Sequence, residues 1–256
     1  MLDFPDPANG APIFSILSTN LRTGKLAKFR RNCFYHFPTG YVPNANISVA
    51  TAVASSSAFP PFLSPNSVQF ESGSVKRIDR ARSSSDLDLH DNESFRYKYK
   101  LTDGGVYDNL GLEDINSEKI KHLFVSDAGA AYQPRNRIFS NWIFQTVHVL
   151  GTIDSQVRSL RIKEINDLVS SRDGAYWRIH TNQDTYNRPE KPINLEQIFT
   201  PQEVSRLSGI STRLSTVSKP HQLINWGYTS TDNALNAFYK NIEKHRVPFN
   251  LPYKND

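Results

Sequence analysis

The segment LTDGGVYDNLGL, residues Leu101–Leu112, is the most informative stretch of this 256-residue chain. Residues 97–101 predict a strand that delivers Asp103 to its carboxyl end, and Gly104 and Gly105 follow at once. In open α/β sheets, sites lie beyond the carboxyl ends of strands, and glycine permits tight turns and close approach of another backbone or a ligand. Asp103 is therefore a candidate site residue. The alternative is a turn aspartate that accepts hydrogen bonds from its own downstream N–H groups.

Two apolar runs near the N-terminus predict a β-hairpin. Residues 12–19, PIFSILST, are apolar and β-branched, and residues 26–29 follow after the turn residues Thr23 and Gly24. We expect the first of these strands to be central in its sheet.

A short helix of small residues is predicted over residues 47–58, ISVATAVASSSA. Asn46 is the expected N-cap, and the pair Pro60 and Pro61 stops the helix. So few charged residues are typical of a buried helix, and small side chains let it approach another element closely.

The remainder of the chain alternates between strand and helix patterns, which favours an α/β layer architecture. Residues 72–96 are rich in serine and charged residues, and they predict a flexible surface insertion. The further predicted elements are a strand over 123–126 that ends at Asp127, a long amphipathic helix over 138–169, a strand over 175–180, a helix over 201–207, and a helix over 229–243 capped by Ser230 or Thr231.

Several of these blocks resemble segments of the patatin-like phospholipases, and they follow one another along the chain in the order that this family shows. The matching blocks are the Asp-Gly-Gly segment over 101–113, a central strand and turn over 12–24, a small-residue helix and proline turn over 50–61, and a following strand over 123–129. The stretches 156–160, 174–179 and 223–228 are similar, less specifically, to one bacterial branch of that family.

The resemblance implies a fold and an activity. The fold is a patatin-like three-layer α/β architecture, a central, mostly parallel sheet with helices on both faces, incomplete in this chain and forming one domain over residues 1–256. The activity is hydrolysis of lipid acyl esters by a serine-aspartate dyad without a cofactor. Asp103 matches the dyad's general base, which takes the serine proton directly, and Gly104 and Gly105 match the turn that aims it.

The nucleophile of such a dyad is absent from these 256 residues. They contain no G-x-S-x-G elbow, and no glycine-rich oxyanion loop precedes Pro12, although the family carries both upstream of the matching segment. Ser211 follows Gly209 but lacks the second glycine, and Ser55–Ser57 belong to the predicted small-residue helix. We expect the serine to come from a separate N-terminal polypeptide, and this chain to be inactive alone. The alternative is an inactive remnant that binds lipid or protein.

Other chemistries receive less support. Cys33 is the single cysteine, which excludes an intrachain disulfide and fits a reducing cytoplasm. Oxygen ligands suit magnesium or calcium, but Asp103, Asp108, Asp114 and Asp127 lack a fixed ligand spacing, so no metal site is expected. The seven histidines show no zinc or relay spacing; they are His36, His90, His122, His148, His180, His221 and His245.

The net charge of +5 permits attraction to anionic lipid or nucleic acid. No basic helix favours nucleic acid, so we expect none as a partner. Basic and aromatic residues crowd the predicted hairpin and are candidates for peripheral contact with a membrane; they are Lys25, Lys28, Arg30 and Arg31 with Phe29, Phe34 and Tyr35. A solvated hairpin edge, where lysine discourages edge pairing, is the alternative. We expect a cytoplasmic protein whose membrane contact, if it occurs, is peripheral.

Overall fold

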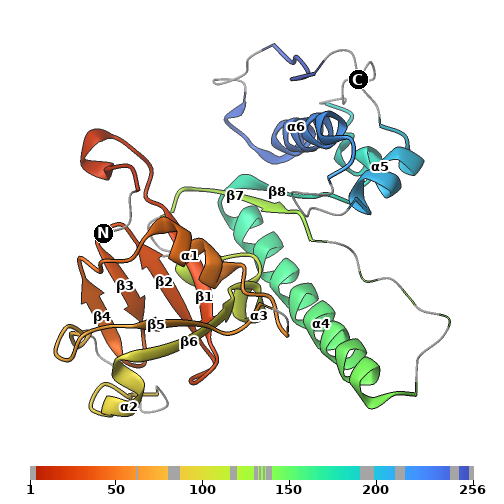
Figure 1. The fold of residues 1–256 in the computed structure, drawn as a ribbon. Helices are drawn as coiled ribbons and strands as arrows, with labels where there is room; N and C mark the ends of the chain where they lie inside the picture. Colours follow the sequence, from red (N-terminus) through yellow and green to blue (C-terminus); the bar gives the residue numbers. More distant parts are fainter. Residues whose placement is uncertain are drawn as a thin grey trace. The chain divides into compact units, whose positions relative to one another are not determined.

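The computed structural model describes residues 4–61, 63–79, 87–115, 120–129, 132, 134, 136, 140–190, 199–210, 217–242 and 248–253. The chain forms two compact units, Met1–Asn116 and Ser117–Asp256, and each is described by itself. Both units contain helices and strands (Figure 1), so the mixed α/β class predicted from the sequence is confirmed. The single domain over 1–256 stays a prediction.

The first unit is built on a six-stranded sheet in the order β4-β3-β2-β1-β6-β5. All five neighbouring strand pairs are antiparallel. The elements of this unit are η1 (Pro7–Asn9), β1 (Ser15–Asn20), β2 (Lys25–Arg30), β3 (Cys33–His36), β4 (Gly40–Pro43), α1 (Val49–Ser56), β5 (Asn66–Gln69), α2 (Glu93–Arg96), β6 (Lys98–Asp103), α3 (Gly105–Asp108) and η2 (Leu112–Asp114).

The central, mostly parallel sheet expected from the sequence is wrong for this unit. The connections between β1 and β4 are only two to four residues long. Parallel neighbours need a crossover of a dozen residues or more, whereas turns this short join antiparallel strands. The connection lengths therefore impose an antiparallel meander on the first four strands.

The predicted hairpin is confirmed. β1 and β2 pair over six positions, from Ser15 opposite Arg30 to Asn20 opposite Lys25. Gly24 in the connecting turn has φ +64°, a left-handed conformation that glycine adopts without steric cost. β1 lies between β2 and β6, which confirms its central position.

The small-residue helix is also present, with a corrected start. Ser48 rather than Asn46 is the N-cap, because Ser48 Oγ accepts a hydrogen bond from Thr51 N at 3.1 Å. Ala52 is fully buried, and α1 packs against β1 and β6. Small side chains allow this close contact with the sheet.

A buried aromatic cluster and a polar network share the core of the first unit. The Phe34 ring lies 5.1 Å from that of Phe29 and 4.8 Å from that of Tyr99, measured between centroids. His36 is fully buried beside them; its Nδ1 contacts Thr39 Oγ1 at 2.9 Å, and its Nε2 contacts Thr23 Oγ1 at 2.9 Å. Burial lowers the pKa of His36 to about 3, so the ring is neutral at pH 7.

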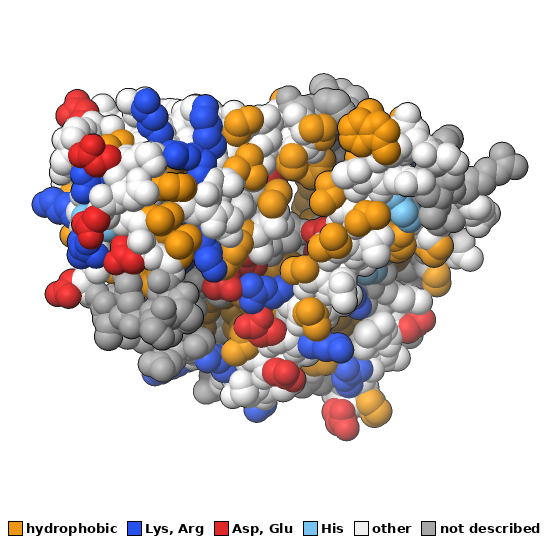
Figure 2. Space-filling model, turned by 90° about the horizontal axis from the view of Figure 1, so that it is seen from below, with side chains coloured by type: hydrophobic (Ala, Val, Ile, Leu, Met, Phe, Trp, Pro, Cys, Tyr) orange, Lys and Arg blue, Asp and Glu red, His pale blue; other side chains and the backbone are white. Residues whose placement is uncertain are grey.

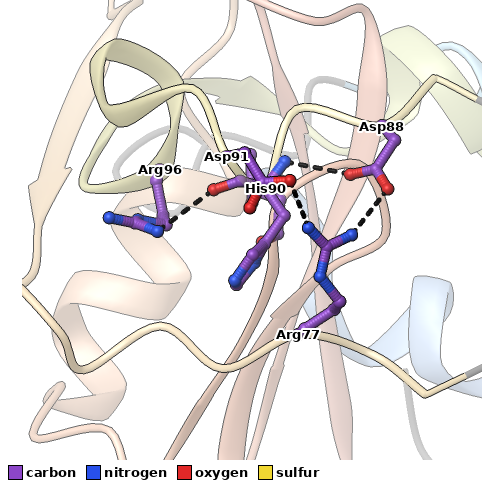
Figure 3. Close-up of polar contacts among 6 residues, drawn as sticks. Arg77, Asp88, His90, Asp91 and Arg96 are labelled. Carbon is purple, nitrogen blue, oxygen red and sulfur yellow. Dashed lines mark hydrogen bonds and ion pairs between the residues drawn. The ribbon is translucent and has the colours of Figure 1, made fainter.

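The predicted insertion over 72–96 makes defined contacts in its described parts. Lys76 exchanges backbone hydrogen bonds with Tyr41, and Val75 and Ile78 are buried. Figure 3 shows the Arg77 guanidinium between the carboxylates of Asp88 and Asp91, which ties the two sides of the insertion together. Residues 80–86 lie outside the described residues, and the flexibility of the insertion stays a prediction.

The second unit contains a two-stranded parallel sheet. Its elements are β7 (His122–Asp127), α4 (Trp142–Ser171), β8 (Asp173–Arg178), η3 (Gln183–Tyr186), α5 (Pro201–Ser208) and α6 (Pro220–Phe238). β7 and β8 pair in parallel from His122 opposite Asp173 to Asp127 opposite Arg178, and α4 is the crossover between them. α4 and α6 pack on opposite sides of this sheet (Figure 1).

The sequence placed most of these elements correctly. The predicted strands, the long helix and α5 overlap the observed ones. The start of the last helix is wrong: α6 begins at Pro220, which occupies the first turn, and the expected caps Ser230 and Thr231 lie inside the helix. Proline is favoured in a first turn because its missing N–H would have no partner there.

α4 carries an apolar stripe that nothing in the described residues covers. The exposed members include Ile143, Val147, Leu150, Ile153, Val157 and Leu160. Ile165, nearer the C-terminal end of α4, is fully buried. Figure 2 shows exposed hydrophobic side chains among interspersed acidic and basic ones on the face it draws. In the described part of the chain, no helix is long and apolar enough to cross a membrane.

The buried His36 predicts a pH dependence of stability. Its folded-state pKa lies below the unfolded value, so the unfolded chain binds a proton more readily as the pH falls from about 6.5 towards 3. We expect the free energy of unfolding to fall with pH in that window, by at most about 1.4 kcal/mol per pH unit from this group. Urea unfolding between pH 7.5 and 4.5 measures it. The His36→Gln variant should have the shallower dependence, and equal slopes would contradict this assignment.

Candidate functional site at the Asp103 turn

Asp103 is the last residue of β6, and α3 begins two residues later. The turn is fixed on two sides. Asp103 lies opposite Ser18 of β1, and Asp103 N donates to Ala58 O at 3.0 Å. Gly104 N donates to Ser56 O at 3.3 Å. The predicted strand running into an Asp-Gly-Gly turn is therefore confirmed, and the turn is held between the central strand and the end of α1.

The Asp103 carboxylate is half-buried and is held by one of its two oxygens. Asp103 Oδ1 accepts a hydrogen bond from Gly105 N at 2.7 Å. In the described part of the chain, Oδ2 accepts no hydrogen bond. This is the contact expected of a turn aspartate, yet it leaves the second oxygen of the carboxylate without a hydrogen bond among the described residues. A general base needs such an oxygen within hydrogen-bond reach of the proton it takes.

Gly104 is required because another strand's backbone lies against it. A Cβ at this position would lie 2.5 Å from Leu17 O. Gly104 has φ −62°, which any residue can adopt, so the constraint is space and not conformation. At Gly105 a Cβ would lie 2.8 Å from Asn109 Oδ1 and 3.0 Å from Asp103 Oδ1. Both glycines therefore permit close approaches that position the Asp103 carboxylate.

Two serines beside the turn, Ser18 and Ser55, have other hydrogen-bond partners. Ser18 Oγ donates to Thr102 O at 2.7 Å and to Ser55 O at 3.1 Å, and Ser55 Oγ donates to Thr51 O at 2.8 Å. Within the described ranges, no serine hydroxyl is hydrogen-bonded to the Asp103 carboxylate. Of these contacts, the bond from Ser18 Oγ to Ser55 O joins α1 to the sheet.

Asp108 and Asp114, the neighbouring acidic residues, are held by structural contacts. Asp108 is buried and accepts from Gly111 N at 3.1 Å and Glu113 N at 2.7 Å. Asp114 forms ion pairs with Lys28, at 2.9 Å, and with Arg30. Burial opposes the charged form of Asp114, but hydrogen bonds from Ser15 and Lys28 and the positive charges of Lys28 and Arg30 hold its pKa below the ordinary value. No group of three metal-ligating side chains occurs among the residues described.

These ion pairs also involve the basic hairpin considered for membrane contact. Lys28 and Arg30 share Asp114, and Arg31 pairs with Asp6 at 3.3 Å. Much of the positive charge of the hairpin is therefore compensated within the first unit. Peripheral membrane contact stays a prediction.

Asp127 has a larger structural role than that of a turn aspartate at the end of a strand. Asp127 Oδ1 accepts from Gly129 N at 2.9 Å, which is the turn contact, but the buried carboxylate also pairs with Arg158 of α4 and accepts from Tyr176 OH at 3.1 Å. Sequence reasoning missed Arg158 and Tyr176, because neither the register of β7 with β8 nor the rotation of α4 can be read from local patterns. The predicted succession of strand, helix and strand was the only sequence signal that these residues could lie close to Asp127.

Comparison with known proteins supplies no further assignment. No protein-family model, curated protein or solved structure matches this chain. The assignment of a function therefore rests on the residues and geometry of the Asp103 turn.

The two aspartates of this segment should respond differently to the same substitution. Asp103→Asn keeps the oxygen that accepts from Gly105 N, so we expect a change in the free energy of unfolding within about 0.5 kcal/mol. Asp108→Asn replaces one accepting oxygen by an NH₂ group beside backbone donors, so we expect a loss of about 1–3 kcal/mol. Denaturant unfolding of both variants measures the contrast, and equal losses would refute it.

The close approach at Gly104 is tested by adding a single methyl group. Gly104→Ala places Cβ against Leu17 O and should destabilise the chain by about 1–3 kcal/mol, the range for overpacking in a tight site. The matched control is Gly227→Ala in α6, where a Cβ meets nothing within 4 Å and helix propensity favours alanine by about 1 kcal/mol. If both variants were stabilised, the backbone contact at Gly104 would be wrong.

Proposed function

We propose that this chain is part of a patatin-like lipid acyl hydrolase and supplies its dyad aspartate, Asp103, while a separate polypeptide segment supplies the serine. The observation that carries the proposal is the Asp103 carboxylate itself, with Oδ1 held by Gly105 N and Oδ2 accepting no hydrogen bond in the described part of the chain. The resemblance of residues 101–113 to the family's Asp-Gly-Gly segment supports the same assignment.

The chemistry of the proposed dyad is the one that the resemblance implies. The serine hydroxyl attacks the ester carbonyl and transfers its proton to Asp103, and the protonated aspartate then donates to the leaving alcohol. Water repeats the sequence on the acyl-enzyme, which releases the fatty acid and restores the serine. A carboxylate is a weak base for a hydroxyl, so the dyad also needs strong oxyanion donors, which the serine-bearing segment has to provide. No cofactor takes part in these steps.

A second candidate is an inactive remnant in which Asp103 has only a structural role. The hydrogen bond from Gly105 N to Asp103 Oδ1 favours it, because a turn aspartate makes the same contact without any catalytic role. The two candidates differ in one respect: only the first requires a negatively charged carboxylate at this position when a serine-bearing partner is present.

The test begins with the chain alone and continues with a partner. The purified chain should show no turnover of a short-chain chromogenic ester, since it lacks a nucleophile and oxyanion donors. When it is co-expressed with an upstream polypeptide that carries G-x-S-x-G, activity should appear. Asp103→Asn should then lower kcat by a factor on the order of 10² to 10⁴.

The control variant is Asp91→Asn, which removes a charge from a side chain that is 83% exposed. It should leave kcat unchanged. Asp127→Asn is a poor control because it breaks a buried ion pair with Arg158. Size-exclusion chromatography has to show that each variant still binds the partner. Turnover by the chain alone, or near-full kcat for Asp103→Asn in an intact complex, would contradict the proposal.

A further inference from the structure

The second unit contains a pocket at the carboxyl ends of its parallel strands. Its volume is about 350 Å³, and its lining includes Arg178, the last residue of β8, and His180 two residues later. Ser155 and Arg158 of α4 line it as well. In α/β sheets, the ends of parallel strands are where ligands bind, because the loops there leave a crevice between strand and helix. This position suggests a ligand site independent of the Asp103 turn.

Arg178 brings to the pocket a positive charge that forms no ion pair among the described residues. Its Nε atom is buried and has no hydrogen-bond partner among the described residues. No ion pair joins Arg178 to an acidic side chain in the described part of the chain, and its guanidinium lies 5.9 Å from the centroid of the Tyr176 ring. A buried N–H group of a charged side chain without a partner is costly, and an anion is the partner that relieves the cost best.

Arg158 is not available to pair with a ligand in this way, because its guanidinium is already bonded to Asp127 and Gly129. Arg158 Nη2 donates to Gly129 O at 2.7 Å, and the guanidinium pairs with the buried Asp127 carboxylate. The Arg158–Asp127 pair is therefore close to neutral as seen from the pocket. Asp127 and Arg178 are opposite each other in the register of β7 and β8, yet the carboxylate pairs with Arg158 of the helix.

His180 provides a second buried nitrogen without a partner. Its Nδ1 atom has no hydrogen-bond partner among the described residues. Burial lowers the pKa of His180, and the positive charge of Arg178 lowers it further, whereas the Asp127 carboxylate and a backbone hydrogen bond at Gly129 oppose the shift. The net effect is a lowered pKa, so the ring adds little positive charge to the pocket at pH 7.

We propose that this pocket binds a small organic oxyanion, a carboxylate or a phosphate ester, with Arg178 as the residue that pairs with its charge. Its volume lies near the lower end of that typical for small-molecule sites, which leaves room for an organic group beyond the anion itself. Ser155 adds a hydroxyl donor to the lining. Asp154 also lines the pocket and adds a negative charge, which favours ligands of low total charge.

The experiment is calorimetric titration of the full chain with two probes, benzoate and phenyl phosphate, at constant ionic strength. The two probes share a ring and differ in the anion, so they distinguish a carboxylate ligand from a phosphate ester. Benzyl alcohol, which has the ring without a charge, is the control ligand. We expect saturable binding of at least one anion and none of benzyl alcohol.

Substitutions of pocket residues test whether the anion binds in this pocket. Arg178→Gln should weaken the binding of the preferred anion by about 10- to 100-fold, since it removes a charged hydrogen-bond donor. The control is Arg206→Gln on α5, which removes the same charge from an arginine outside the lining and should leave the affinity unchanged. Ser155→Ala is a second variant that leaves β8 intact and should weaken binding less.

Three results would overturn the proposal. One is that neither anion binds the wild-type chain more strongly than benzyl alcohol does. This measurement does not depend on the folding of any variant. The second is that Arg178→Gln or Ser155→Ala, folded by circular dichroism, binds the preferred anion with wild-type affinity. The third is loss of binding in Arg206→Gln to the same extent as in Arg178→Gln, which would show that net charge, and not this pocket, attracts the anion.

Discussion

The close approach of two backbones at Gly104 is the constraint on which the candidate site depends. Leu17 O occupies the space where any side chain at residue 104 would begin, so β1 and the end of β6 can come together only with glycine there. Glycine thus permits the turn to lie against the central strand, and backbone hydrogen bonds from Asp103 N and Gly104 N to the end of α1 hold it there. Gly105 N then fixes Asp103 Oδ1, and the second carboxylate oxygen accepts no hydrogen bond in the described part of the chain. A steric requirement of the backbone thus sets the direction of one acidic side chain.

The sequence predicted this region well because its information is local. A strand pattern, an acidic residue and two glycines occur together in Leu101–Leu112, and each has a specific local consequence: pairing, a turn, a close approach. The hairpin of β1 and β2 was predictable for the same reason, since Gly24 and the flanking apolar runs lie within twenty residues of each other. Short helices such as α1 were found with an error of two residues at the cap.

The direction of strand pairing was not predictable in this way. An expectation of a central parallel sheet came from the resemblance and from the alternation of elements, while the two- to four-residue connections between β1 and β4 require antiparallel pairing. The pocket of the second unit was missed for a related reason. Arg178 and Arg158 are twenty residues apart in sequence, and only the parallel register of β7 with β8 and the rotation of α4 bring them to one cavity. Such tertiary facts leave no local pattern.

Asp103 is proposed to activate a serine on another segment, and the reactivity of that serine is the most direct measure of this activation. A fluorophosphonate probe reacts with the serine itself, so its labelling rate reports activation without dependence on any lipid substrate. In a complex with a G-x-S-x-G partner, Asp103→Asn should lower the labelling rate by a factor on the order of 10² or more while the complex stays assembled. An unchanged labelling rate in that intact complex would contradict the account, and the Asp103 carboxylate would then be a turn residue only.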